Sequence, residues 1–180
     1  MAQTPTSLWR SSWPPTRLAW LPQEQILFDG ARLHRTLHVS LAENAALTLV
    51  ESVVFGRLGM NETCSAGAFR DRWRIRRGGR LVFAEDVRLG NAIDITLARR
   101  AGGNGACALA TFLHVGPDAE ARLEETRAML ADGSCERGVS AFDGMLVARF
   151  LSRDPQALRA DLACFTERFR GCAMPRSWQT

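Results

Sequence analysis

Two glutamates occupy positions where the surrounding pattern calls for apolar side chains. Glu51 lies in the apolar run 45–56, and Glu85 lies in the alternating run 80–89. Successive side chains of a strand point to opposite faces. Each glutamate therefore shares its face with apolar neighbours, which are Leu47, Leu49, Val53 and Phe55 for the first and Leu81, Phe83, Val87 and Leu89 for the second. An ionised carboxylate in apolar surroundings is costly, so each glutamate needs a cationic partner or a raised pKa.

Two interpretations of these glutamates remain open from spacing alone. In the structural one, each glutamate pairs with an arginine inside the core, and Arg57 and Arg35 are the available candidates. In the functional one, Glu51 and Glu85 line a polar path through a β structure. Carboxylate oxygens are adequate, weak and exchangeable ligands for a divalent ion, which suits passage better than storage.

A row of arginines follows the same alternation. One face of the run 69–76 carries apolar residues such as Trp73, and the other face carries Arg70, Arg72, Arg74 and Arg76. This basic face could be a solvated surface whose charges protect an exposed strand. It could also bind an acidic protein or a phosphate backbone. Trp73 lies on the opposite face, so aromatic interleaving is poor and nucleic-acid binding is the least favoured of the three interpretations.

No constellation in the sequence predicts catalysis. His34 and His38 are four residues apart, which is roughly 13 Å along one strand. One metal ion at ~2 Å from each nitrogen cannot take both. The sequence contains no G-x-S-x-G, no H-E-x-x-H and no phosphate loop of the G-x-x-x-x-G-K type. These residues therefore neither favour an enzyme nor exclude one.

Turn and period signals predict a mainly β chain with two helices near its C-terminus. Gly78-Gly79 and Asp143-Gly144 are hairpin turns between alternating runs. Further strands are expected over 32–41, 45–56, 93–97 and 106–115. An amphipathic helix is expected over 117–133, and a second begins after Asp154, its N-cap, with Pro155 at the first position.

Length and composition favour one cytoplasmic domain. The chain has 180 residues, of which 46% are hydrophobic and 23% charged, with a formal charge of +4. Residues 1–16 form an irregular lead, and 17–180 a single domain. Five cysteines without a C-x-x-C pair fit a reducing compartment better than a disulfide framework or a zinc module. No apolar run reaches the ~18 residues of a membrane span, and we find no signal peptide.

Five blocks of sequence carry a family pattern, at residues 20–32, 51–57, 76–89, 143–151 and 175–180. The last block, Pro-Arg-Ser-Trp-Gln-Thr, is the most specific. Together, in this order and at these intervals, the blocks resemble the urease accessory protein UreD family, called UreH in some species. The resemblance runs from Trp20 to the end of the chain. The substantial β region that usually precedes the first block in that family has no counterpart here, so the domain is expected to be incomplete on its N-terminal side.

The resemblance implies a fold and a function. The fold is a β-helix-like stack of strands with two C-terminal helices. The function is that of a non-enzymatic chaperone that helps insert nickel into apo-urease in a complex with UreF and UreG. Nickel is implied as a transported ion, with no tightly bound cofactor, and Glu51 and Glu85 as part of its route. Contacts with partner proteins are implied for residues of the matching blocks and the loop between them, Arg57, Glu62, Arg176 and Trp178.

Overall fold

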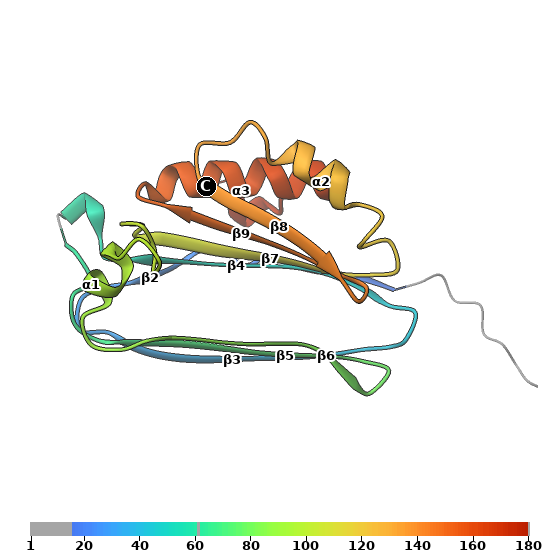
Figure 1. Cartoon of the computed structure of the whole chain (residues 1–180), viewed down its shortest axis with the longest axis horizontal. Coiled ribbons are helices and arrows are strands. Elements are labelled where there is room, and N and C mark those ends of the chain that lie inside the picture. Colours follow the sequence, from blue (N-terminus) through green and yellow to red (C-terminus); the bar gives the residue numbers. More distant parts are fainter. Residues whose placement is uncertain (1–15, 61, 180) are drawn as a thin grey trace, which may run out of the picture.

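The molecule is built in three layers, with two helices over a large sheet and a small sheet beneath it (Figure 1). The computed structural model describes residues 16–60 and 62–179. The irregular lead predicted over 1–16 lies outside the described residues except for its last position. The mainly β prediction is confirmed, because most of the regular structure in the described residues is strand.

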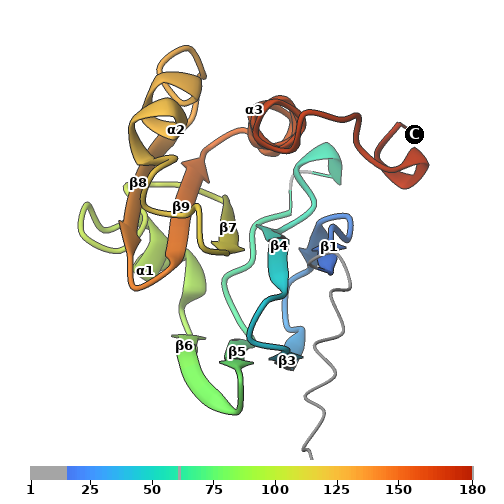
Figure 2. The ribbon, with the colours of Figure 1, turned by 90° about the vertical axis from the view of Figure 1, so that its right-hand side faces the viewer.

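The large sheet has strand order β1-β4-β7-β9-β8, and β2 pairs with β4 on the same side as β1. Its strands are β1 (Arg17–Trp20), β2 (Gln25–Leu27), β4 (Ala46–Phe55), β7 (Ala108–Val115), β8 (Glu136–Phe142) and β9 (Met145–Ser152). The small sheet has the order β3-β5-β6. Its strands are β3 (Arg32–Leu41), β5 (Ala68–Arg77) and β6 (Arg80–Leu89). Figure 2 shows the two sheets edge-on, with the small sheet below β4, β7 and β9.

Strands β2 to β5 alternate between the two sheets. β2 and β4 pair in parallel in the large sheet, and β3 and β5 pair in parallel in the small sheet. The chain therefore coils from one sheet to the other, in line with the β-helix-like stack that the family resemblance implied. From β6 onward the pairs β5–β6, β4–β7, β7–β9 and β8–β9 are antiparallel.

Both predicted hairpin turns are confirmed. Gly78 and Gly79 have φ angles of 55° and 79°, and Asp143 and Gly144 have φ angles of 50° and 74°. Two successive residues with positive φ define the type I′ turn, whose twist matches that of the flanking strands. The turns fix the register of β5 with β6 and of β8 with β9.

The C-terminal helix begins as predicted. In α3 (Pro155–Arg170) the Asp154 carboxylate accepts hydrogen bonds from the backbone N–H groups of Gln156 and Ala157. The other predicted helix is shorter than the pattern 117–133 suggested, because α2 covers only Leu123–Met129 and turns precede it. The face predicted to point inward was Ala119, Leu123, Thr126 and Leu130; Leu123 is partly buried and the other three are buried. Two short 3₁₀ helices, η1 (Leu58–Met60) and η2 (Arg176–Trp178), complete the described elements.

One predicted strand is wrong. Residues 93–97 form the helix α1 (Ile93–Ala98). Ile93 and Leu97, four residues apart, are buried, while Ile95 is 57% exposed. In a strand all three would share one face, whereas a helix brings only the first and last together. A five-residue alternation is too short to separate the two periods.

The core lies on both faces of the large sheet. On its helical side, Phe112 and Phe150 pack against Phe165 and Phe169 of α3. Between the sheets lie two separate apolar clusters, one around Trp73 and one around Phe69. Among the helices of the described residues, none combines the length and the apolar character needed to cross a membrane.

Candidate functional site: a polar layer between the sheets

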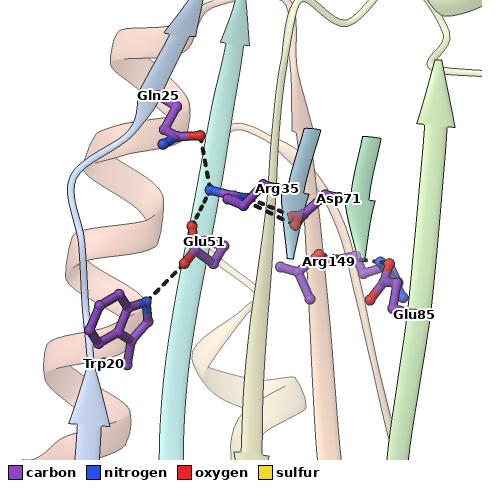
Figure 3. A network of polar contacts seen from close by, with 8 residues as sticks. Trp20, Gln25, Arg35, Glu51, Asp71, Glu85 and Arg149 are labelled. Carbon is purple, nitrogen blue, oxygen red and sulfur yellow. Dashed lines mark hydrogen bonds and ion pairs between the residues drawn. The ribbon is translucent and has the colours of Figure 1, made fainter. Parts of the chain in front are cut away.

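A layer of polar side chains separates the two apolar clusters between the sheets. Six strands each contribute one inward residue, and we call this set the inter-sheet polar layer: Arg35, Glu51, Asp71, Glu85, Thr111 and Arg149. Glu85 lies in register with Trp73, one inward position along from Asp71. In the large sheet, Glu51 pairs in register with Thr111, and Thr111 with Arg149. In the small sheet, Arg35 pairs in register with Asp71. Figure 3 shows how these side chains meet.

Glu51 is held by two donors. The indole Nε1 of Trp20 donates to its Oε1 over 2.8 Å, and a guanidinium nitrogen of Arg35 lies 2.5 Å from its Oε2 (Figure 3). The side chain is only 7% exposed. Burial raises the pKa of Glu51, because removal from water penalises the charged form and Arg35 offsets only part of that penalty.

Arg35 serves two carboxylates at once. Besides Glu51 it binds Asp71 as a fork, with 3.0 Å from Nε to Oδ1 and 2.5 Å from the other nitrogen to Oδ2. It also donates to the side-chain oxygen of Gln25 over 3.1 Å. Burial opposes the charged form of Arg35, but these hydrogen bonds and charges outweigh it and raise its pKa. Only the guanidinium fork can satisfy both carboxylates in this way.

Glu85 forms the second pair of the layer. Its Oε1 accepts a hydrogen bond of 2.7 Å from Arg149, which also donates to Thr111 Oγ1 over 3.2 Å. The Oε2 atom of Glu85 is buried and has no hydrogen-bond partner among the described residues. A carboxylate oxygen in this condition retains unused capacity to bind a donor or a cation.

The layer is anionic and reaches solvent on two sides. Three carboxylates and two guanidinium groups give a formal charge of −1 when all are ionised. At the β1 side Trp20 is 48% exposed, and at the β9 side the Arg149 side chain is 53% exposed. The layer thus offers a polar band across the interior, between surfaces on opposite sides of the sandwich.

The structure brings the two predicted glutamates into one layer and pairs each with an arginine. The structural interpretation is confirmed for Glu51 with Arg35. Arg57 was the wrong candidate for the second pair, since it binds Glu62, and Arg149 takes its place beside Glu85. The route for a metal ion stays a prediction. Within the described residues, no three or more His, Cys, Asp or Glu side chains gather in a group that could hold a metal ion.

Arg57 and Glu62 lie outside the layer, on the connection after β4. They form an ion pair, and the hydrogen bond from Arg57 lowers the pKa of Glu62. The backbone N–H of Asp29 donates to Glu62 Oε1 over 2.9 Å, and the Arg57 guanidinium lies 5.5 Å from the Phe28 ring centroid. The pair fastens this loop to the segment after β2. A partner contact through it stays a prediction.

The closing block of the chain packs against the first block. The Trp178 indole Nε1 donates to the carbonyl of Leu21 over 2.9 Å, and the ring is 8% exposed. Arg159 of α3 donates to the carbonyl of Trp178, stacks over its ring at 5.0 Å and pairs with Glu24. The structure therefore gives Trp178 an internal role. Arg176 is exposed, and its predicted contact with a partner stays a prediction.

The predicted arginine row lies on the outer face of the small sheet. Phe69, Trp73 and Ile75 are buried on the opposite face, as the alternation predicted. Arg72 and Arg76 are exposed, and Arg70 and Arg74 are partly buried.

Comparison with known proteins agrees with the resemblance seen in the sequence. The family model of the UreD urease accessory protein matches residues 14–179. A urease accessory protein UreD of Methylobacterium sp. (strain 4-46) is 49% identical over 172 residues, which are 93% of this chain and 61% of the relative. The protein of the same name from Beijerinckia indica is 53% identical over 151 residues, which are 83% of this chain and 56% of the relative.

A third relative, UreD of Xanthobacter autotrophicus, is 46% identical over 164 residues, which are 91% of this chain and 57% of the relative. The chain thus spans well under two thirds of the length of the curated relatives it matches. Over that span, the family model covers both the strands that form the polar layer and the closing block that binds Leu21. The chain belongs to the UreD urease accessory protein family.

Proposed function

We propose that this chain acts in the maturation of urease as an accessory protein, without catalysis of its own, and that it passes nickel ions to apo-urease. In this proposal it works in the cytoplasm, in a complex with UreF and UreG, and holds no resident cofactor. Family membership supports the general role, since the relatives are named urease accessory proteins.

The observation that carries the nickel route is the inter-sheet polar layer. It crosses a sandwich that is otherwise apolar on both sides of it. Its formal charge of −1 attracts a cation, and its carboxylates Glu51 and Glu85 stand on opposite sides of the Arg35–Asp71 pair (Figure 3). The buried, unpartnered Oε2 of Glu85 is a free oxygen ligand.

The arginines make this layer suited to transit. A nickel ion that approaches Glu51 must compete with Arg35, and at Glu85 it must compete with Arg149. Competition of this kind lowers the affinity at each position and leaves the ligands exchangeable. Oxygen ligands are also weaker partners for nickel than imidazole nitrogens. The same carboxylates can therefore form ion pairs with the arginines and also bind a passing nickel ion.

The structure makes glutamate-to-glutamine replacement a clean test. In Glu51→Gln, Arg35 keeps its fork to Asp71. In Glu85→Gln, Arg149 is half-exposed and can be hydrated. Neither change leaves a fully buried arginine without a partner, so the fold and the capture by UreF are expected to survive. Each change removes one negative charge from the layer.

The assay is urease activation in cells that supply this chain together with the urease subunits, UreF and UreG. Urease activity and nickel content per urease are expected to fall in Glu51→Gln and Glu85→Gln, with UreF capture unchanged. The matched control is Glu124→Gln, an exposed glutamate of α2 that pairs with Arg127. Full activation by both layer variants, at equal protein level, would refute the route.

A further inference from the structure

The outer face of the small sheet is strongly basic and carries no covering layer. In Figure 1 the helices lie on the far side of the large sheet, and nothing among the described residues covers the lower face of β3, β5 and β6. We call this surface the basic sheet face and define it by six arginines: Arg32, Arg70, Arg72, Arg74, Arg76 and Arg88. They come from three strands and are held in place by the sheet ladder.

One carboxylate on this face, that of Asp86, is already bound by two arginines. Arg70 and Arg88 lie opposite each other in register, which is unfavourable for like charges. Asp86 resolves the conflict by accepting from both guanidinium groups, with distances between 2.6 and 3.1 Å. These two hydrogen-bonded arginines strongly lower the pKa of Asp86. Asp86 therefore stays ionised and bound, and it has little capacity left for Arg72, its own register partner.

The remaining arginines of the face have no internal counter-charge. Arg74 donates to the carbonyls of Trp73 and Glu85, and Arg76 to the carbonyl of Gly79. Across the part of the chain that the structure describes, no carboxylate lies within ion-pair distance of Arg32, Arg72, Arg74 or Arg76. A surface that repeats one charge without pairing it raises the local potential and steers oppositely charged molecules toward it.

We propose that the basic sheet face is a docking surface for an acidic segment of a partner protein. Alternate residues on β5 are roughly 6.7 Å apart, a spacing that carboxylates at alternate positions of an extended acidic segment would match. Arginine is enriched at protein interfaces because its planar fork binds carboxylates in pairs. Alternation predicted Leu81 on the inward face with Phe83, but a register shift between Ile75 and Arg76 pairs Leu81 with Arg76 instead. The 41% exposed Leu81 therefore gives the basic sheet face an apolar margin.

Protein is favoured over nucleic acid by the position of the rings. Phe69, Trp73 and Phe83 all point between the sheets and are buried. Binding of single-stranded nucleic acid uses aromatic rings on which bases stack. Among the described residues, the strands of the basic sheet face present no Phe, Trp or Tyr ring there, only the smaller imidazoles of His34 and His38. The apolar margin at Leu81 serves a protein interface and has no use on a phosphate backbone.

This inference does not rest on the nickel route. On β5 the arginines of the basic sheet face point outward, and Asp71 of the polar layer points inward. Replacements on one face of the strand therefore leave the other face intact. Glu51→Gln and Glu85→Gln are expected to leave binding at the basic sheet face unchanged. The nickel route and the docking surface can therefore be tested independently.

The test uses fluorescently labelled poly-L-glutamate as the probe and the double variant Arg72→Gln/Arg76→Gln of the full chain. Both side chains are exposed, so thermal unfolding should be unchanged. Loss of two exposed ion pairs of ordinary strength weakens binding roughly two- to thirtyfold. The matched control is Arg99→Gln/Arg100→Gln, which removes the same charge from an exposed loop and should bind like the parent.

Three outcomes overturn the proposal. The parent chain could fail to bind poly-L-glutamate at low salt, where surface charges are least screened. The two double variants could lose affinity equally, which would reduce the effect to net charge. A single-stranded oligonucleotide of equal charge could bind more tightly than poly-L-glutamate and depend on Arg72 and Arg76, which would assign the face to nucleic acid. Selective weakening of poly-L-glutamate binding by Arg72→Gln/Arg76→Gln supports it.

Discussion

Arg35 is the residue whose removal should damage the fold most sharply, because one guanidinium serves two buried carboxylates. The side chains of Glu51 and Asp71 are 7% and 8% exposed, and Arg35 pairs with both. Arg35→Met keeps an unbranched side chain of similar length and leaves both carboxylates without their cation. Breaking a buried pair by removing one partner costs about 3–5 kcal/mol. For a chain of this size that corresponds to a melting temperature lower by about 6–20 °C.

The measurement is the free energy of unfolding from urea or thermal melts of the parent and the variants. Arg35→Lys retains the charge without the fork and should lie between Arg35→Met and the parent. Adding Glu51→Gln to Arg35→Met removes one stranded carboxylate and should recover part of the loss, which a double-mutant cycle quantifies. The control is Arg32→Met on the exposed face of the same strand, expected to change stability by less than about 0.5 kcal/mol.

The pH dependence of Arg35→Met separates electrostatics from packing. Without Arg35 the pKa of Glu51 rises further, so protonation of Glu51 at low pH removes a buried charge and the loss of stability should shrink. If Arg35→Met lowers the free energy of unfolding by no more than Arg32→Met does, the pairing of Arg35 with Glu51 and Asp71 does not stabilise this layer, and the reasoning is refuted. A loss of equal size at low and neutral pH would assign the effect to packing.

Three further variants test other parts of the structure. Burial raises the pKa of Glu51 above its ordinary 4.5. The stability that this group contributes is therefore present at pH below 4.5 and is lost as the pH rises through the folded-state pKa. Thermal melts of Glu51→Gln at several pH values should lack this part of the pH dependence of stability. Trp178→Phe removes the hydrogen bond to the Leu21 carbonyl and should lower the free energy of unfolding in urea by about 1–3 kcal/mol. The control Arg176→Met should leave that free energy nearly unchanged. Gly79→Ala strains a residue with φ of 79° by about 1–2 kcal/mol in the same assay, and Gly79→Asn should be milder.

Local signals in the sequence were sufficient for both hairpin turns and for the strands β3 to β9, whereas β1 and β2 were not predicted. The alternation over β5 and β6 has ten residues on each side of a Gly-Gly turn, so a one-residue slip would bury the arginines and expose Trp73. The N-cap Asp154 and the following proline fixed the start of α3 in the same way. The helix α1 could not be predicted, because its five-residue pattern fits both periods and only tertiary burial distinguishes them.

The candidate site was only half visible in the sequence. Glu51, Glu85 and Arg35 stood out because each interrupts an apolar face. Asp71 gave the same signal between Phe69 and Trp73 and was overlooked beside the arginine row, although it lies on the other face. The choice of Arg149 as partner for Glu85 depends on how the two sheets stack, since 64 residues separate them. Spacing along the chain carries no information on that contact.

The composition of the polar layer argues that it serves a purpose other than stability. Buried ion pairs often gain less than they lose in desolvation, and well-packed apolar residues in their place are often neutral or stabilising. Glu51 shows this cost directly, since burial raises its pKa despite two hydrogen-bond donors. The two apolar clusters on either side of the layer would merge if these strands carried leucine or valine at the same level. This fold instead has carboxylates and arginines on five strands, and one Glu85 oxygen has no partner among the described residues. It thereby keeps a polar connection through its interior and gives up a continuous apolar core.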